Sequence, residues 1–214
     1  MSLLDSIKRK ARPLICPFDP ILDAIPGRSA VFDIGCGSGF LLGLIAERKT
    51  PKSLAGAEID QKLVEAARNY LRDKSEKIPV SVNLFDGITL PAEVSNADIV
   101  TLVDVLHHVP PDQQVAFLQT TFQRMRSGAV FILKDIDAGR RVLCLANKFH
   151  DLVVTGSPGN ELPKNRTKEI LECAGFQILS AGEERKLWYP HYWFICRKPT
   201  AQGGSSKFQT PSTN

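Results

Sequence analysis

The fold of this chain is decided by one stretch, which reads VFDIGCGSG at residues 31–39. A short apolar run reaches Asp33, a turn with glycine at positions 35, 37 and 39 follows, and apolar residues begin again at Phe40. Glycine permits positive φ and lets a ligand approach the backbone closely, while the amides at a helix start favour an anionic group. The stretch therefore predicts a strand, a tight ligand-binding loop and the beginning of a helix.

On both sides of this stretch, short apolar runs alternate with longer segments of helical periodicity. Strands are expected at residues 30–34, 53–58, 80–85, 97–103 and 129–134, and helices at residues 40–47, 61–72 and 113–125. Such alternation is typical of parallel strands joined by helical crossovers. The pattern predicts an α/β fold with these strands in one central sheet.

The pattern changes after residue 134. Apolar residues recur at helical spacing between residues 142 and 152, and the GSPGN stretch at 156–160 interrupts the chain before a helix expected at 167–174. Residues 135–166 are therefore interpreted as a lid-like insertion. Strands at residues 176–183 and 192–197 are expected to form an antiparallel hairpin at a sheet edge, connected through residues 188–191.

Length and composition indicate one domain. The chain has 214 residues, of which 43% are hydrophobic and 23% charged, and a formal net charge of +4. We expect a single domain over residues 1–198, with an N-terminal helical segment at 1–28 and a disordered tail at 199–214. The five cysteines are scattered and are expected to be reduced.

No apolar run approaches the roughly 20 residues that cross a bilayer, and the first 12 residues lack the apolar core of a signal peptide. A cytoplasmic location without a transmembrane segment is therefore expected. The same segment combines apolar and basic residues, which leaves contact with a membrane surface open, although a solvated helix explains it better.

Glycine spacing separates the classes of nucleotide-binding loop. A mononucleotide P-loop requires Gly-Lys-Ser/Thr after the turn, whereas residues 39–41 read Gly-Phe-Leu. A dinucleotide loop requires a third glycine at position 40, where Phe40 stands. The stretch resembles instead motif I of the class I S-adenosylmethionine-dependent methyltransferases, Asp/Glu-x-Gly-x-Gly-x-Gly, at every fixed position.

Three further strand ends resemble this family in the same order. In the family the acid that ends the second strand binds the ribose hydroxyls, the acid after the third strand reads the adenine, and the segment after the fourth strand lies along the methionine end. Here these places hold Glu58, Asp86 and the DVLHHVP segment at 104–110. The resemblance implies these cofactor-binding residues: Asp33, Gly35, Cys36, Gly37, Gly39, Glu58, Ile59, Asp86, Gly87 and Asp104.

The resemblance also implies S-adenosylmethionine as the cofactor, S-adenosylhomocysteine as its product and a Rossmann-like fold. That fold is a seven-stranded, mostly parallel sheet with an antiparallel last strand and helices on both faces. The resemblance covers residues 30–134 and extends more loosely to the terminal hairpin. Taken singly, each acid has a structural alternative as a helix cap or a loop acid, so the expectation depends on their joint order.

A hydroxyl, a carbon acid or a protonated amine needs a base when it accepts a methyl group, and histidine is suited to this near neutral pH. We favour His108, with His191 and His150 as further candidates. Asp135 and Asp137 follow the fifth strand, but the adjacent Asp-Asn pair of metal-dependent O-methyltransferases is absent, so no metal is expected.

The expected acceptor is a small molecule, a lipid or a polyketide-like compound. Nucleic acid ranks lower because Pro110-Pro111 is preceded by valine and followed by aspartate, which departs from the Asn/Asp-Pro-Pro-Tyr/Phe motif of amino-methylating nucleic-acid enzymes. Two alternatives stay open: a nucleic-acid or protein methyltransferase, and a non-catalytic module that binds S-adenosylmethionine.

Overall fold

The computed structural model describes residues 16–138, 159–187 and 189–200. The first half of the N-terminal segment, most of the expected lid with His150, and the tail beyond residue 200 lie outside the described residues. The elements are, in chain order, α2 (Asp19–Asp23), β1 (Ala30–Ile34), α3 (Phe40–Arg48), β2 (Ser53–Glu58), α4 (Gln61–Ser75), β3 (Val80–Leu84), η1 (Ala92–Asn96), β4 (Ile99–Val103), η2 (Leu106–His108), α5 (Gln114–Arg124), β5 (Val130–Ile136), α7 (Lys164–Ala174), β6 (Gln177–Lys186) and β7 (Tyr189–Arg197).

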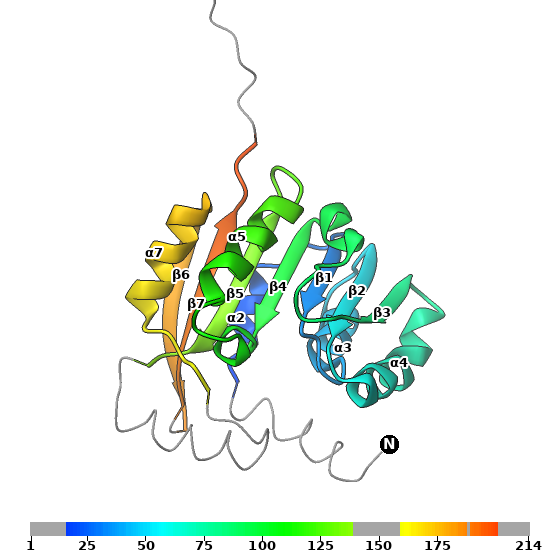
Figure 1. Ribbon diagram of the computed structural model, residues 1–214. Coiled ribbons are helices and arrows are strands. Elements are labelled where there is room, and N and C mark those ends of the chain that lie inside the picture. Colours follow the sequence, from blue (N-terminus) through cyan, green and yellow to red (C-terminus); the bar gives the residue numbers. More distant parts are fainter. Residues whose placement is uncertain (1–15, 139–158, 188, 201–214) are drawn as a thin grey trace, which may run out of the picture.

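One seven-stranded sheet runs through the molecule in the order β3-β2-β1-β4-β5-β7-β6 (Figure 1). Strands β1 to β5 pair in parallel, and β7 pairs antiparallel with both β5 and β6. This confirms the predicted Rossmann-like sheet with an antiparallel last strand. The strand order reverses between β1 and β4, and open α/β sheets bind ligands outside the carboxyl ends of the strands at such a switch point.

The two faces of the sheet carry separate cores, because successive side chains of a strand point to opposite faces. One core joins the sheet to η1, α5 and α7, and the other joins it to α2, α3 and α4. In Figure 1, α5 and α7 lie in front of the sheet and α2 lies behind it. Helices therefore cover both faces, and the carboxyl ends of the parallel strands are left for the loops.

The terminal hairpin is longer and tighter than expected from the sequence. Strand β6 continues to Lys186 and β7 already begins at Tyr189, so residues 189–191 belong to a strand and not to the connection. Proline is tolerated at the start of a strand, and the carbonyl of Pro190 accepts a hydrogen bond from Asp137. Strand β5 likewise continues to Ile136, so the first residues assigned to the lid are strand residues.

Candidate active site

The glycine loop connects β1 to α3 and keeps close to β2. The amides of Gly35 and Cys36 donate to the carbonyl of Ala57, at 2.8 and 3.0 Å. Gly35, Gly37 and Gly39 all have positive φ, of 70°, 54° and 80°. At Gly35 there is also no room for a side chain, since a Cβ added there would lie 2.4 Å from Cγ2 of Val105.

Side chains below the loop hold it from inside the protein. The hydroxyl of Thr101 on β4 donates to Oδ1 of Asp33 at 2.6 Å, and both side chains are buried. Cys36 is buried against β2, where a Cβ on Gly56 would lie 2.8 Å from its Sγ. Burial, together with the charges of Asp33 and Glu58, raises the pKa of the Cys36 thiol. The thiol therefore stays protonated and serves packing.

Glu58, at the carboxyl end of β2, connects two neighbouring strand ends. Its Oε2 accepts from the amide of Gly37 at 2.9 Å, and its Oε1 accepts from the amides of Ile59 and Asp60 at 2.7 and 3.1 Å. A carboxylate offers about four lone-pair sites. One acceptor position on Oε2 thus remains after the backbone bonds, at the place where the loop meets the end of β2.

The turn after β3 brings a second carboxylate to the same edge of the sheet. Oδ1 of Asp86 accepts from the amides of Ile88 and Thr89, at 2.8 and 2.6 Å. The amides of Thr89 and Ile88 lower the pKa of this exposed carboxyl, which is therefore ionised at neutral pH. Gly87 lies next to Ile59, since a Cβ on it would lie 3.7 Å from Cγ2 of that side chain.

Two large apolar side chains flank this turn in exposed positions. Ile59 is 65% exposed and Ile88 is 75% exposed. Exposed single apolar residues are ordinary on protein surfaces. These two, however, lie close to Asp86: the amide of Ile88 donates to its carboxylate, and Ile59, directly after β2, lies next to Gly87.

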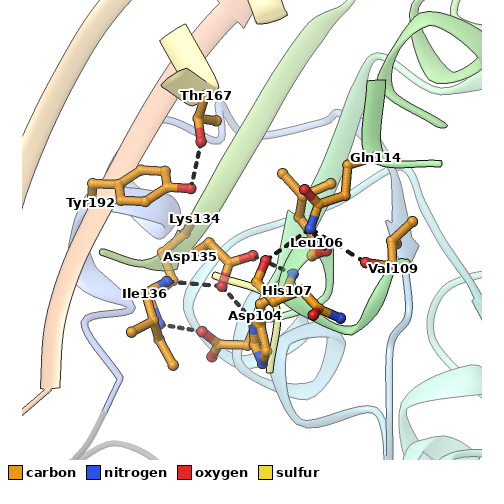
Figure 2. A network of polar contacts seen from close by, with 11 residues as sticks. Asp104, Leu106, His107, Val109, Gln114, Lys134, Asp135, Ile136, Thr167 and Tyr192 are labelled. Carbon is orange, nitrogen blue, oxygen red and sulfur yellow. Dashed lines mark hydrogen bonds and ion pairs between the residues drawn. The ribbon is translucent and has the colours of Figure 1, made fainter. Parts of the chain in front are cut away.

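The segment after β4 is held by two consecutive residues of β5, Lys134 and Asp135 (Figure 2). Nζ of Lys134 donates to Oδ1 of Asp104 at 2.6 Å, and Oδ1 of Asp135 lies 2.5 Å from Nδ1 of His107. Because neighbouring strand residues point to opposite faces, the two contacts hold the segment from both sides of the sheet. We call these four residues the β4–β5 junction.

The Asp104–Lys134 contact is an ion pair with one buried partner. The side chain of Lys134 is fully buried and that of Asp104 is 19% exposed. Burial acts to lower the pKa of the Lys134 ammonium, but the charge of Asp104, its hydrogen bond and further charges nearby, including that of Asp135, together raise the pKa. Asp104 has a φ of 57°, which is uncommon for a residue with a side chain.

The Asp135–His107 contact is buried on both sides, with the two side chains 2% and 3% exposed. Asp135 also accepts from the amides of His107 and Ile136, at 3.1 and 2.8 Å. With Asp135 as the acceptor, Nδ1 of His107 carries the hydrogen. Its ring packs against that of His108, with 4.0 Å between the centroids.

Gln114, the first residue of α5, also holds the segment after β4 through hydrogen bonds. Its buried side-chain amide donates to the carbonyls of Leu106, Val109 and Asn160, at 3.2, 3.3 and 2.8 Å. The amide of Asn160 in turn donates to the carbonyl of His107 at 2.7 Å. The short turn η2 is therefore tied to β5, to α5 and to the residues before α7.

The predicted histidines have different environments. His108 is exposed on η2, at the carboxyl end of β4. His191 is buried within β7, opposite Ile136 of β5, and not in a loop as expected. His150 lies outside the described residues. Sequence reasoning missed the roles of His107, Gln114, Lys134 and Asp135, and the available signal was a Lys-Asp pair inside the apolar run FILKDI.

Within residues 16–138, 159–187 and 189–200, no group of three or more His, Cys, Asp or Glu residues is placed to hold a metal ion. Asp135, considered from the sequence as a metal ligand, is bonded to His107 instead. None of the described helices combines the length and the apolar character that a membrane span requires.

Comparison with known proteins adds to this geometry. Residues 32–131 match the family model described as a methyltransferase domain. The chain is 24% identical over 140 residues to carboxy-S-adenosyl-L-methionine synthase of Campylobacter fetus subsp. fetus, covering 63% of this chain and 58% of that protein. It is 29% identical over 117 residues to indolepyruvate C-methyltransferase of Streptomyces griseus, covering 52% of this chain and 35% of that protein.

Among solved structures, a S-adenosylmethionine-dependent methyltransferase from Aquifex aeolicus has the same fold, with a TM-score of 0.69 at 16% sequence identity. The similarity covers 91% of this chain and 96% of that one. The chain spans less than two thirds of the length of either curated relative.

Proposed function

Because the chain belongs to the class I S-adenosylmethionine-dependent methyltransferases, we propose that it transfers a methyl group from S-adenosylmethionine to a small-molecule or lipid-like acceptor. The observation that carries this proposal is the Glu58 carboxylate, which lies 2.9 Å from the Gly37 amide at the adjoining ends of β1 and β2. A carboxylate beside a glycine loop provides an acceptor for sugar hydroxyls next to backbone amides for an anionic group.

The remaining acceptor position on Oε2 of Glu58 suits one ribose hydroxyl directly. The ionised carboxylate of Asp86 and the backbone of Gly87 suit the exocyclic amine of the adenine. Ile59 and Ile88, exposed near that carboxylate, offer apolar surface to the ring. Together, these polar and apolar groups fit a nucleoside whose other end carries a carboxylate and an ammonium group.

When bound, the cofactor supplies an activated methyl group, so the main task of the protein is to align the acceptor, which contributes about 7–11 kcal/mol. His108 is the proposed base. It is exposed on a turn that Gln114 and His107 hold in place, and a neutral imidazole accepts a proton near pH 7. General-base assistance of this kind contributes about 10²–10⁴-fold.

A small acceptor is supported by the names of the two curated relatives, one a synthase of a modified S-adenosylmethionine and the other a C-methyltransferase of indolepyruvate. The segment after β4 also lacks the Pro-Pro-Tyr/Phe element of amino-methylating nucleic-acid enzymes, since Asp112 follows its prolines. We infer that a small molecule is favoured over nucleic acid as the acceptor.

Titration calorimetry with S-adenosylhomocysteine tests the cofactor site. We expect wild-type protein to bind, and Glu58→Ala to lose roughly 10–100-fold in affinity because a charged hydrogen bond contributes about 1.5–3 kcal/mol. Glu65→Ala, at an exposed position of α4, is the matched control and should bind as wild type does. Folded wild-type protein that produces no binding heat would refute the proposal.

Transfer of a labelled methyl group to a panel of hydroxy acids, phenols and keto acids tests the reaction. Once an acceptor is identified, His108→Gln should lower the rate of methyl transfer to it about 10²–10⁴-fold. The affinity for S-adenosylhomocysteine should stay unchanged. Equal rates for the variant and the wild type would exclude His108 as the base.

A further inference from the structure

The ion pair of the β4–β5 junction lies at the switch point of the sheet. Asp104 follows β4 directly, and the next residue, Val105, packs so closely on Gly35 that no Cβ would fit there. The Asp104 carboxylate is therefore anchored one residue from a direct contact with the glycine loop. In the family that the sequence resembles, the segment after the fourth strand, which here begins at Asp104, lies along the methionine end of the cofactor.

The two charges of the pair have unequal access to this crevice. Lys134 is the one lysine among the described residues that is buried, and its side chain has no exposed surface. Of the two side chains, only that of Asp104 reaches the surface, with 19% of its area exposed. A ligand at the switch point thus meets the carboxylate first, with its charge compensated from behind at 2.6 Å.

Compensation matters for the chemistry of methyl transfer. The positive charge of a sulfonium disappears as the methyl group leaves, whereas the thioether product is neutral. A carboxylate with an uncompensated charge would hold the charged reactant more tightly than the transition state, and interactions of that kind slow the chemical step. A carboxylate paired with an ammonium can orient the ligand without this cost.

We propose that Lys134 is a positioning residue for the methionine end of the cofactor, which holds Asp104 in place and limits the preference of the pocket for the charged sulfonium over the neutral thioether. This proposal rests on the proposed function, because it requires S-adenosylmethionine to bind at the switch point.

The test compares two affinities in each protein, for S-adenosylmethionine and for S-adenosylhomocysteine, by titration calorimetry. Lys134→Met removes the compensating charge, and the affinity ratio should shift toward the charged ligand by roughly tenfold, as expected for one nearby unit charge at partial exposure. Lys134→Gln also removes the charge but retains an N–H donor for Asp104, and it should shift the ratio in the same direction. This variant replaces Lys134→Met in the test if the methionine variant does not fold.

Two controls separate charge from structure. The double variant Lys134→Met with Asp104→Asn has no charge at either position, so its ratio should return close to that of wild type. Lys74→Met removes another lysine that pairs with a carboxylate, Glu47, on the helical side of the sheet, and its ratio should not change.

The possible outcomes are distinct. If Lys134→Gln or Lys134→Met weakens both ligands equally, the pair is only structural and the inference is overturned. If wild-type protein binds neither ligand, the proposed function fails before the inference is tested. A shifted ratio that the double variant reverses supports both.

Discussion

The glycine-loop region and the β4–β5 junction hold their polar groups in different ways. In the loop region, Glu58 accepts hydrogen bonds from three backbone amides, which belong to the loop or to the two residues directly after β2. At the junction, side chains of β5 contact side chains that lie 28 and 30 residues away in the chain. The comparison teaches that the loop depends on backbone conformation, whereas the junction depends on buried charge.

The largest effect is expected from removing a charge at the junction. Asp135→Ala leaves the ring of His107 and two backbone amides without their acceptor in a buried place, so we expect the free energy of unfolding to fall by about 3–5 kcal/mol. Urea denaturation followed by circular dichroism measures this change.

Asp112→Ala is the matched control for that variant. Asp112 is an exposed acid in the turn before α5, and substitutions at such surface positions change stability by about 0.5 kcal/mol or less. A loss at Asp135 no larger than the loss at Asp112 would show that the junction is not held by buried charge.

A smaller effect is expected in the loop region, where Gly35 and Gly87 provide a matched pair. Both have positive φ, but only Gly35 also lacks space for a side chain. A Cβ added at Gly35 would lie 2.4 Å from Val105, whereas a Cβ added at Gly87 would make only ordinary van der Waals contacts. Gly87→Ala should cost about 1–2 kcal/mol from backbone strain alone, and Gly35→Ala should cost more and weaken S-adenosylhomocysteine binding.

Val105→Ala combined with Gly35→Ala should recover part of the difference, because it removes the atoms that the new Cβ would meet. Thermal denaturation of the wild type, Gly35→Ala, Gly87→Ala and the Gly35→Ala/Val105→Ala double variant measures the change in stability. Titration calorimetry with S-adenosylhomocysteine measures the change in affinity. Equal costs at the two glycines would contradict the close approach of Val105 to the loop.

The smallest effect concerns Tyr192, which lies on β7 opposite Asp135. Its hydroxyl lies 2.8 Å from Oγ1 of Thr167, and burial, followed by the charge of Asp135, raises its pKa well above the ordinary value. Tyr192→Phe should lose about 1 kcal/mol at neutral pH for this hydrogen bond.

The pH dependence follows from the sign of that shift. A raised pKa in the folded state gives stability that is present below the unfolded value, about 10, and is lost as the pH rises through the folded value. The wild type should therefore lose stability faster than Tyr192→Phe above about pH 10. Lys134, whose pKa is also raised, titrates in both proteins and cancels in the difference. Parallel stability curves up to pH 11 would show that the phenol is not buried in its neutral form.

Much of the sheet could be predicted from the sequence because its strands are local apolar runs. Strands β1 and β2 have the expected bounds, and the five strands pair in parallel in one sheet as expected. The last strand is longer than the sequence predicts, since Tyr189, Pro190 and His191 carry no strand pattern by themselves. They become strand residues because β7 pairs with β5 on one side and β6 on the other.

The sequence by itself determined the glycine loop, the acid that ends β2 and the acid after β3. The φ angles of the glycines and the contacts of Glu58 and Asp86 are set by residues close in the chain or by the loop's own amides. Only the tertiary structure decided the β4–β5 junction. The pairs Asp104–Lys134 and His107–Asp135 form because two parallel strands in register bring these side chains together. A lysine and an aspartate at the end of an apolar run do not reveal their partners until the strands are paired.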